Sequence, residues 1–453
     1  MLALGKEVVA LSRADRLAGL KRIVPAARIK RVLEQSGRSG RRCLRLPAVF
    51  MVWFVLAMGL FHRDCYRQVF RRIMAWGGPG SIPGRSTLCE ARHRLGVAPL
   101  VRLAGETVTL LAHPDTPGAF YRGMRLMALD GFVIDLPDSP LNERVFGRPA
   151  GSRAPGAFPQ ARVVGLCEAG THVMWQWRIK PIRIAEQTMA DGLLGRLEAD
   201  MLLMWDRGFL SYARVRRVAE QGAHLLARVK SNLVFEPFSR LSDGSYLAKL
   251  YRCQKDRRHD RDGIIVRIID YTFDDPNRPG CGQKHRLLTT LLDPLADPAA
   301  VLVELYHVRW EEELGIDEIK THEMDGRATM RSQTPAGVIQ EIYAMLIDHF
   351  VIRVLMFEAA AKKAIAPIRL SFTGTLKILG CRLPECPARP AGQRRWWENL
   401  LTEIGEEVLP PRRNRINPRV IKRKMSKWLK KRPTHRHYPQ PGKFFRESIV
   451  LLR

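Results

Sequence analysis

The sequence Met201-Leu-Leu-Met-Trp205-Asp206-Arg-Gly-Phe209 determines the fold class. Five consecutive apolar residues are typical of a short strand that is buried on both faces. A helical pattern over 212–221 and a second apolar run over 223–229 follow it. A strand, a helix and a strand in this order predict a right-handed βαβ unit and therefore an α/β fold.

The residues before this unit predict further strands, which follow a helical region. Residues 1–120 have helical patterns, whereas 124–136 form an apolar run that Asp130 interrupts. Residues 162–180 predict a hairpin of two strands around Glu168-Ala-Gly-Thr. We therefore expect an all-helical N-terminal domain over 1–120 and a mixed core that begins at 121.

The residues after the βαβ unit change character twice. Short β-type runs alternate with charged links over 231–292, which predicts a β insertion between two parts of the core, 121–230 and 293–385. The last segment, 386–453, is a basic C-terminal region. Within it, 412–437 contain twelve Lys or Arg and no acid, and we expect them to stay solvated until they meet a polyanion. A helix over 420–431 that touches a second protomer is a further expectation.

The stretch Tyr306-His-Val-Arg309-Trp-Glu-Glu-Glu313-Leu-Gly-Ile-Asp-Glu-Ile-Lys320 predicts a helix with a polar face. At about 100° per residue, Tyr306, Arg309, Glu313 and Lys320 fall within roughly 60°. The hydroxyl and the two cations suit phosphate oxygens, and the carboxylate suits a hard divalent metal. The alternative is a solvated face on which Arg309 pairs with Glu313.

Three carboxylates could act together. Asp130 lies inside an apolar strand, Asp206 follows a buried strand at the end where α/β sheets collect ligands, and Glu313 lies on the polar-faced helix. Such a set can hold two Mg²⁺ ions about 4 Å apart for phosphodiester chemistry, with Arg207 among the nearby cations. Each carboxylate also has a simpler explanation: Asp130 in a turn, Asp206 as a helix cap, Glu313 as an ion-pair partner.

The composition favours a polyanionic partner. The chain has 75 Lys and Arg against 45 Asp and Glu, a net charge of +30. The positive electrostatic field of such a chain attracts nucleic acid. Binding to acidic lipid is less favoured, because the basic residues are interleaved with apolar segments. A short basic helix with Arg92, His93 and Arg94 follows a turn-rich segment, 77–84, an arrangement that resembles a helix-turn-helix unit.

No feature of the sequence predicts a membrane span. The longest apolar run, 48–61, has 14 residues, fewer than the ~20 that a bilayer requires, and indicates a buried helix instead. The first residues lack a signal peptide, so we expect a cytoplasmic protein. The eight cysteines form no CxxC pair or zinc ligand set, and we expect reduced thiols.

Three blocks of sequence resemble the DDE transposases of the bacterial "insertion sequence four" family. The first contains Asp130 and extends to Gly147, the second is Trp205-Asp206-Arg-Gly-Phe-Leu-Ser-Tyr212, and the third matches the Tyr-x2-Arg-x3-Glu-x6-Lys signature at every position. The resemblance implies an RNase H-like catalytic core with an inserted β subdomain. One departure is Phe132, where the family usually has Thr.

The resemblance also implies an activity. Asp130, Asp206 and Glu313 would be catalytic metal ligands for two Mg²⁺ ions, with Mn²⁺ as a substitute, and Tyr306, Arg309, Lys320 and Arg207 would bind DNA. The partners would be double-stranded DNA, as terminal inverted repeats and as target, and a second protomer in a homodimer on paired ends. The insertion has no Trp, so a hairpin route is not predicted. The alternatives are an inactive or domesticated DNA-binding relative and a nuclease without strand transfer.

Overall fold

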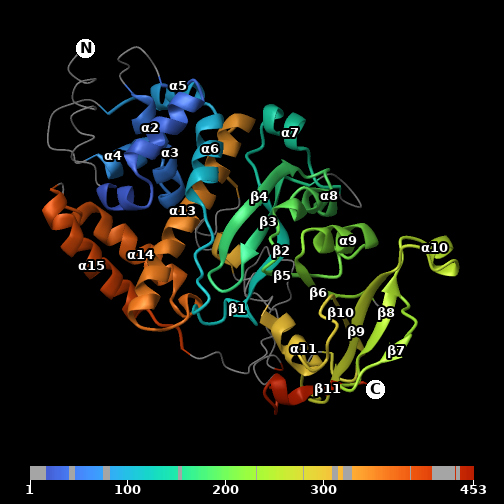
Figure 1. Cartoon of the computed structure of the whole chain (residues 1–453). Helices are drawn as coiled ribbons and strands as arrows, with labels where there is room; N and C mark the ends of the chain where they lie inside the picture. The colour runs from blue at the N-terminus through green and yellow to red at the C-terminus, as the bar shows by residue number, and fades with distance from the viewer. Residues whose placement is uncertain are drawn as a thin grey trace. The chain divides into compact units, whose positions relative to one another are not determined.

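The computed structural model describes residues 17–39, 46–74, 82–150, 156–230, 232–278, 280–308, 315–319, 329–387, 389–410, 434 and 439–452. Contacts divide the chain into two compact units (Figure 1). The first unit is Met1–Leu193 with Trp310–Leu409, and the second is Leu194–Arg309 with Pro410–Arg453. The mixture of strands and helices confirms the α/β class.

Two groups of helices in the first unit share one hydrophobic core. The N-terminal group is η1 (Ala18–Arg22), α2 (Ala26–Gln35), α3 (Ala48–Leu60), α4 (Tyr66–Ile73), α5 (Arg85–Leu95) and α6 (Ala98–Thr107). The later group is α13 (Pro335–Lys362), η4 (Pro367–Arg369), α14 (Phe372–Arg382), η5 (Leu383–Glu385) and α15 (Pro390–Glu406). Both groups contribute to the same core, because α3 packs against α13. The predicted burial of the 48–61 run in a helix is confirmed.

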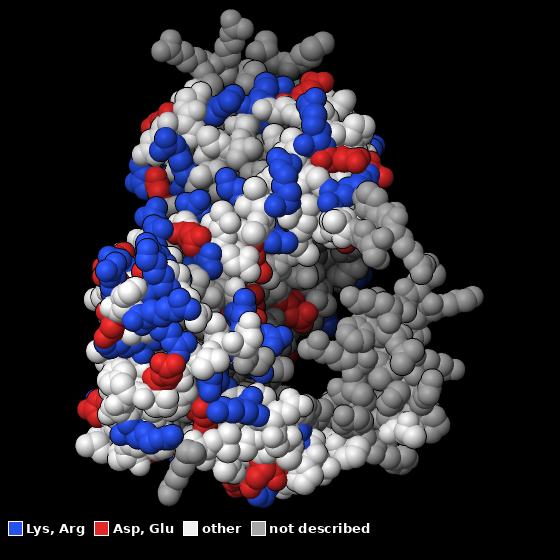
Figure 2. Space-filling model, turned by 90° about the vertical axis from the view of Figure 1, so that its right-hand side faces the viewer, with Lys and Arg blue, Asp and Glu red and all other residues white. Residues whose placement is uncertain are grey.

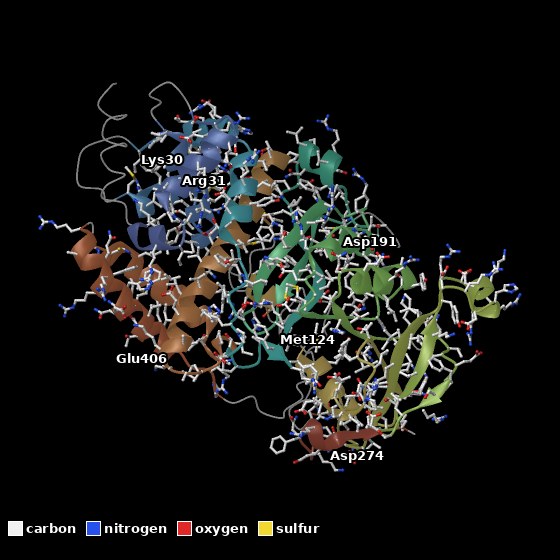
Figure 3. The ribbon with its side chains drawn as sticks, in the orientation of Figure 1. Lys30, Arg31, Met124, Asp191, Asp274 and Glu406 are labelled. Carbon is white, nitrogen blue, oxygen red and sulfur yellow. The ribbon has the colours of Figure 1, made fainter. Side chains whose placement is uncertain are left out.

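The strands of the first unit are antiparallel. They are β1 (Phe120–Tyr121), β2 (Met124–Asp135), β3 (Gln160–Glu168) and β4 (Val173–Pro181), and they pair in chain order. The strand and the hairpin expected from the sequence are therefore confirmed. Helices α7 (Pro140–Phe146) and α8 (Glu186–Asp191) follow β2 and β4. Figure 3 labels Met124, with which β2 begins, and Asp191, with which α8 ends.

The second unit contains the predicted βαβ unit. Strand β5 (Met201–Trp205) leads through α9 (Tyr212–Glu220) to β6 (His224–Arg228), which pairs with β5 in parallel. Strand β10 (His285–Thr289) joins β6 and is followed outward by β9 (Ile264–Phe273), β8 (Tyr246–Leu250) and β7 (Ser239–Arg240). The remaining elements are η2 (Leu194–Arg196), α10 (Gln254–Arg258), α11 (Ala299–Val308), η6 (Arg446–Ser448) and β11 (Ile449–Leu451). The β-rich character of 231–292 is confirmed, while the domain boundaries stay predictions.

Two expectations fall partly outside the described residues. Helix α11 ends at Val308, and 315–319 are helical again, but 309–314 and 320–328 are not described. The basic segment 412–437, apart from Thr434, is not described either. The single helix expected over 306–320 and the tail helix over 420–431 therefore stay predictions.

One basic residue of α5 is buried, although the sequence predicted a helix whose basic side chains contact DNA. Arg92 is buried, and its guanidinium donates hydrogen bonds to Gln340 Oε1, Ser332 Oγ, the Gly337 carbonyl and the Tyr66 hydroxyl. It therefore joins α5 to the start of α13 and is unavailable to DNA. His93 and Arg94 are exposed and stay candidates for DNA contact.

Two other expectations concern membranes and thiols. Among the described residues, no helix is both long enough and apolar enough to cross a membrane. The described cysteines form no disulfide with one another.

One acid in the first unit is buried without a counterion among the described residues. Asp348 of α13 is 2% exposed, and a Cβ on Gly59 of α3 would lie 2.0 Å from its Oδ2. Burial raises the pKa of Asp348 well above its ordinary value of 3.8, although the Leu60 amide donates to the carboxylate. The protonated carboxyl is therefore the form that this interface favours.

We expect the Asp348→Asn variant to gain thermal stability relative to the parent protein as the pH rises. The raised pKa means that the carboxyl's contribution to stability is complete below about pH 3.8 and is lost as the pH rises through the folded-state pKa. Melting temperatures at pH 5 and pH 8 measure the difference. A substitution effect of the same size at both pH values would contradict the prediction.

Candidate active site

Asp130 lies in the middle of β2, not in a turn. It is half-buried, and its Oδ1 accepts a hydrogen bond from the Gly131 amide at 2.8 Å. The residue opposite it on β3 is Gly165, where an added Cβ would lie 2.9 Å from the Met174 side chain. The turn explanation for Asp130 is therefore wrong.

The face of β2 that carries Asp130 is covered by helical segments from the second half of the chain. Side chains alternate along a strand, so Asp130 shares its face with Phe132 and Ile134. Those two residues pack in one core with Ile316 and Ile319. The helical segment 315–319, which follows Glu313 in the sequence, therefore packs on the sheet face that carries Asp130.

The loop after β2 is fixed to the start of α13. Ser139 caps α7 by accepting from the Asn142 amide, and its hydroxyl donates to the Gln333 carbonyl at 2.7 Å. The buried Asn142 side chain donates to the carbonyls of Pro137 and Ser332. The first sequence block therefore forms β2 and α7. The loop and helix after β2 are hydrogen-bonded to the residues just before α13.

Asp206 follows β5 directly, at the carboxyl end of a strand with a parallel neighbour. It is half-buried, and its Oδ1 accepts a hydrogen bond from the Gly208 amide in the following turn. The cap of the next helix is Ser211, whose Oγ accepts from the Arg214 amide. The explanation of Asp206 as a helix cap is therefore wrong. Arg207, in the same turn, is exposed.

Tyr306 supports the end of β5. Its side chain is buried on α11, and its hydroxyl donates to the Trp205 carbonyl at 3.2 Å. This contact fixes the residue immediately before Asp206. The predicted contact between Tyr306 and phosphate stays a prediction, as do the roles of Arg309, Glu313 and Lys320, which lie outside the described residues.

The described carboxylates have the chemistry of Mg²⁺ ligands. Oxygen donors select hard cations, and Asp130 and Asp206 each hold one carboxylate oxygen in place through a backbone amide. Within the described ranges, no group of three His, Cys, Asp or Glu side chains is arranged for a metal. Glu313, the third predicted ligand, lies outside those ranges.

Sequence reasoning missed a buried polar cluster on the same unit. Glu318 contacts His172, His349 and Arg353, which come from the β3–β4 turn and from α13. The only sequence signal was an acid in an apolar helical stretch five residues after Glu313. Its partners are 31 to 146 residues away along the chain, so spacing alone could not identify them.

The surface is rich in bases. On the face shown in Figure 2, Lys and Arg side chains gather over the upper and left-hand parts of the described surface, with Asp and Glu side chains among them. Lys30 and Arg31 project from α2 (Figure 3), and Arg31 forms an ion pair with Glu106 of α6. Such a surface is suited to a polyanion.

Comparisons with known proteins identify two regions. Residues 14–104 match the family Insertion element 4 transposase N-terminal, and residues 121–349 match the family Transposase DDE domain. The chain is 28% identical over 409 residues to the transposase InsG for insertion sequence element IS4 of Escherichia coli (strain K12), covering 88% of this chain and 90% of that protein.

Two further matches are more distant. The putative transposase InsZ of Escherichia coli (strain K12) is 25% identical over 219 residues, covering 47% of this chain and 72% of that protein. The piggyBac transposase in its synaptic complex with hairpin DNA, solved by cryo-EM, aligns over 87% of this chain and 85% of that chain at 12% identity, with a TM-score of 0.39. A score this low does not establish a common fold.

We expect the Tyr306→Phe variant to lose about 1 kcal/mol of folding free energy, because a buried carbonyl loses its donor. Tyr212→Phe is a matched control, since the Tyr212 hydroxyl also donates to a backbone carbonyl, that of Asp262 at 2.6 Å, but at the surface. Urea unfolding of both variants measures the difference. Equal losses would show that burial adds nothing to the contribution of the Tyr306 hydroxyl, and no loss in the Tyr306→Phe variant would show that this hydroxyl does not stabilise the end of β5.

Proposed function

The chain belongs to the IS4 family of DDE transposases, and from that premise we propose that it cuts DNA at the ends of an insertion sequence and joins the freed ends to target DNA. The observation that carries the proposal is the position of Asp130. It lies inside a strand, on the sheet face against which the segment following Glu313 packs. A carboxylate in that position offers oxygen ligands to a hard divalent cation.

The proposed core is RNase H-like. Strand β2 carries the first carboxylate, β5 ends at the second, and the region after α11 supplies the third. The β-rich segment between β6 and α11 would be the insertion that separates the second carboxylate from the third. In this proposal the three acidic residues come from three parts of the chain that are far apart in sequence.

The proposed chemistry is a pair of phosphoryl transfers. Water attacks a phosphorus atom at the element end, the P–O3′ bond breaks, and a free 3′-OH remains. That 3′-OH then attacks a phosphorus atom of the target, forms a new P–O bond and displaces the target's own 3′ oxygen. When bound, two Mg²⁺ ions would supply activation of the attacking oxygen and stabilisation of the leaving one.

The residues of this chain have separate roles in that proposal. Asp130, Asp206 and Glu313 supply oxygen ligands, and the amides of Gly131 and Gly208 orient the first two. Arg207, Arg309 and Lys320 neutralise backbone phosphates, and Tyr306 keeps the strand end before Asp206 in place. The partners are the terminal inverted repeats, the target duplex and a second protomer, because both ends must be cut together.

We expect Asp130→Asn, Asp206→Asn and Glu313→Gln each to reduce strand cleavage by more than about 10²-fold while DNA binding is retained, because each removes a ligand charge with little change of shape. Asp135→Asn is a matched control on β2, since Asp135 is also half-buried and accepts from Gln160 Nε2 at 2.7 Å. Cleavage of labelled element ends measures the effect.

Three outcomes of that assay would count against the proposal. A wild-type protein that binds the ends without cutting them would indicate an inactive, domesticated relative. Cleavage without joining would indicate a nuclease. Any of the three variants that cuts within about tenfold of the wild type would remove that residue from the ligand set.

Cleavage should require Mg²⁺ or Mn²⁺, whereas Ca²⁺ should support DNA binding with little cleavage, because a ligand set of carboxylate oxygens selects hard cations. The measurement is end cleavage by EDTA-treated protein after each metal is added back. Full activity with Zn²⁺ alone would point to a different kind of site.

A further inference from the structure

A buried ring of charged and polar side chains holds the helical segment 315–319. Glu318 forms an ion pair with Arg353 Nη2, its Oε1 lies 3.2 Å from His172 Nδ1, and its Oε2 lies 3.3 Å from His349 Nε2. Arg353 Nη2 also lies 2.7 Å from His172 Nδ1, which closes the ring. His349 and Arg353 are one turn apart on α13, and His172 lies in the turn between β3 and β4. One carboxylate therefore attaches the segment to two other elements.

The same segment is held on its other sides by packing. A Cβ on Gly315 would lie 3.3 Å from the Cβ of His172, so the backbone passes close to the hairpin turn. Ile316 and Ile319 are buried with Phe132 against the face of β2 that carries Asp130. Residues 318 and 319 have π-helical geometry, which is common at functional sites. The segment is thus fixed in its position along the sheet.

The charged and polar groups of the ring contribute more to a defined geometry than to folding stability. Burial would raise the pKa of Glu318, but the charge of Arg353 and the contacts with His172 and His349 outweigh it and hold the pKa well below its usual range. Among the described residues, Arg353 Nε and Nη1 and His349 Nδ1 are buried without a hydrogen-bond partner. A buried ion pair with unsatisfied donors is seldom more stable than apolar side chains of the same volume. Its distinctive effect is to specify one geometry.

We propose that Glu318 is a positioning residue for the active site: its contacts with Arg353, His172 and His349 hold the segment 315–319, which follows Glu313 in the sequence, on the sheet face that carries Asp130, and metal binding at the proposed site depends on this anchoring. Five residues of chain can span at most about 17 Å, so fixing Glu318 limits where Glu313 can lie. The catalytic assignment of Glu313 rests on the proposed function, whereas the anchoring of 315–319 does not. The two parts can therefore be tested separately.

The test replaces the charged pair by neutral side chains of similar size in the full-length protein, as Glu318→Gln with Arg353→Met. The matched control is Glu341→Gln with Arg92→Met, because this pair is also buried and Glu341 also lies on α13, where the described contacts join it to α5 and, through Arg92, to α4 rather than to 315–319. A milder variant, His172→Asn, removes the ring nitrogen next to Glu318. Asn tolerates the positive φ of 58° at this position.

Three readouts separate anchoring from catalysis. Hydrogen exchange of a peptide covering 315–319 should become at least tenfold faster in the Glu318/Arg353 variant and in His172→Asn, and should stay unchanged in the control. The apparent Kd for Mn²⁺, measured by electron paramagnetic resonance on the protein bound to element-end DNA, should rise about tenfold. The kcat for end cleavage should fall while the affinity for end DNA stays the same.

The outcomes are distinguishable. Unchanged exchange at 315–319 in the His172→Asn variant, or unchanged Mn²⁺ affinity in a variant whose exchange has increased, would overturn the proposal. An equal loss of Mn²⁺ affinity in the control would also overturn it, because the effect would then reflect general stability. If the wild-type protein neither binds Mn²⁺ nor cuts DNA but exchange at 315–319 still responds, the proposed function has failed and the anchoring of 315–319 has not.

Discussion

The packing of α13 on one face of β2 and β3 is the constraint on which the candidate site depends. Val338, Ile342 and Leu346 of α13 pack in the core that contains Phe132 and Ile134 of β2. Because side chains alternate along β2, the same arrangement places Asp130 on the covered face and in a half-buried position. A carboxylate at an exposed edge of the sheet would have neither the low-dielectric surroundings nor the nearby helical segment 315–319.

Three of the buried ionisable groups on α13 are accommodated in different ways. Glu341 is buried with Arg92 and Arg331, and those charges outweigh burial and lower its pKa. Asp348 has no such partner among the described residues, and its pKa is raised. Arg353 is paired with Glu318. Two of the three groups therefore attach α13 to another element, which links the N-terminal helices and the 315–319 segment to the same helix.

The sequence predicts elements well where the pattern is local. A strand pattern can be recognised from neighbouring residues alone. Two examples are the apolar run at Met201–Trp205 and the interrupted apolar run that forms β2. The inward orientation of Arg92 could not be predicted, because its partners Gln340 and Gly337 are more than 240 residues away along the chain. The same reason applies to Glu318. The contact of the Tyr306 hydroxyl with the Trp205 carbonyl could not be predicted either, because it depends on the fold of the second unit, and the phosphate contact of Tyr306 stays a prediction.

The central claim is that Asp130, Asp206 and Glu313 bind the same metal ions beside DNA. Anomalous scattering from Mn²⁺ in crystals of the protein with an uncleavable element-end duplex tests this claim most directly. The account predicts peaks within about 2.5 Å of carboxylate oxygens of all three residues, next to the scissile phosphate. Manganese peaks that lie away from Asp130, or that involve only histidine or cysteine side chains, would contradict it.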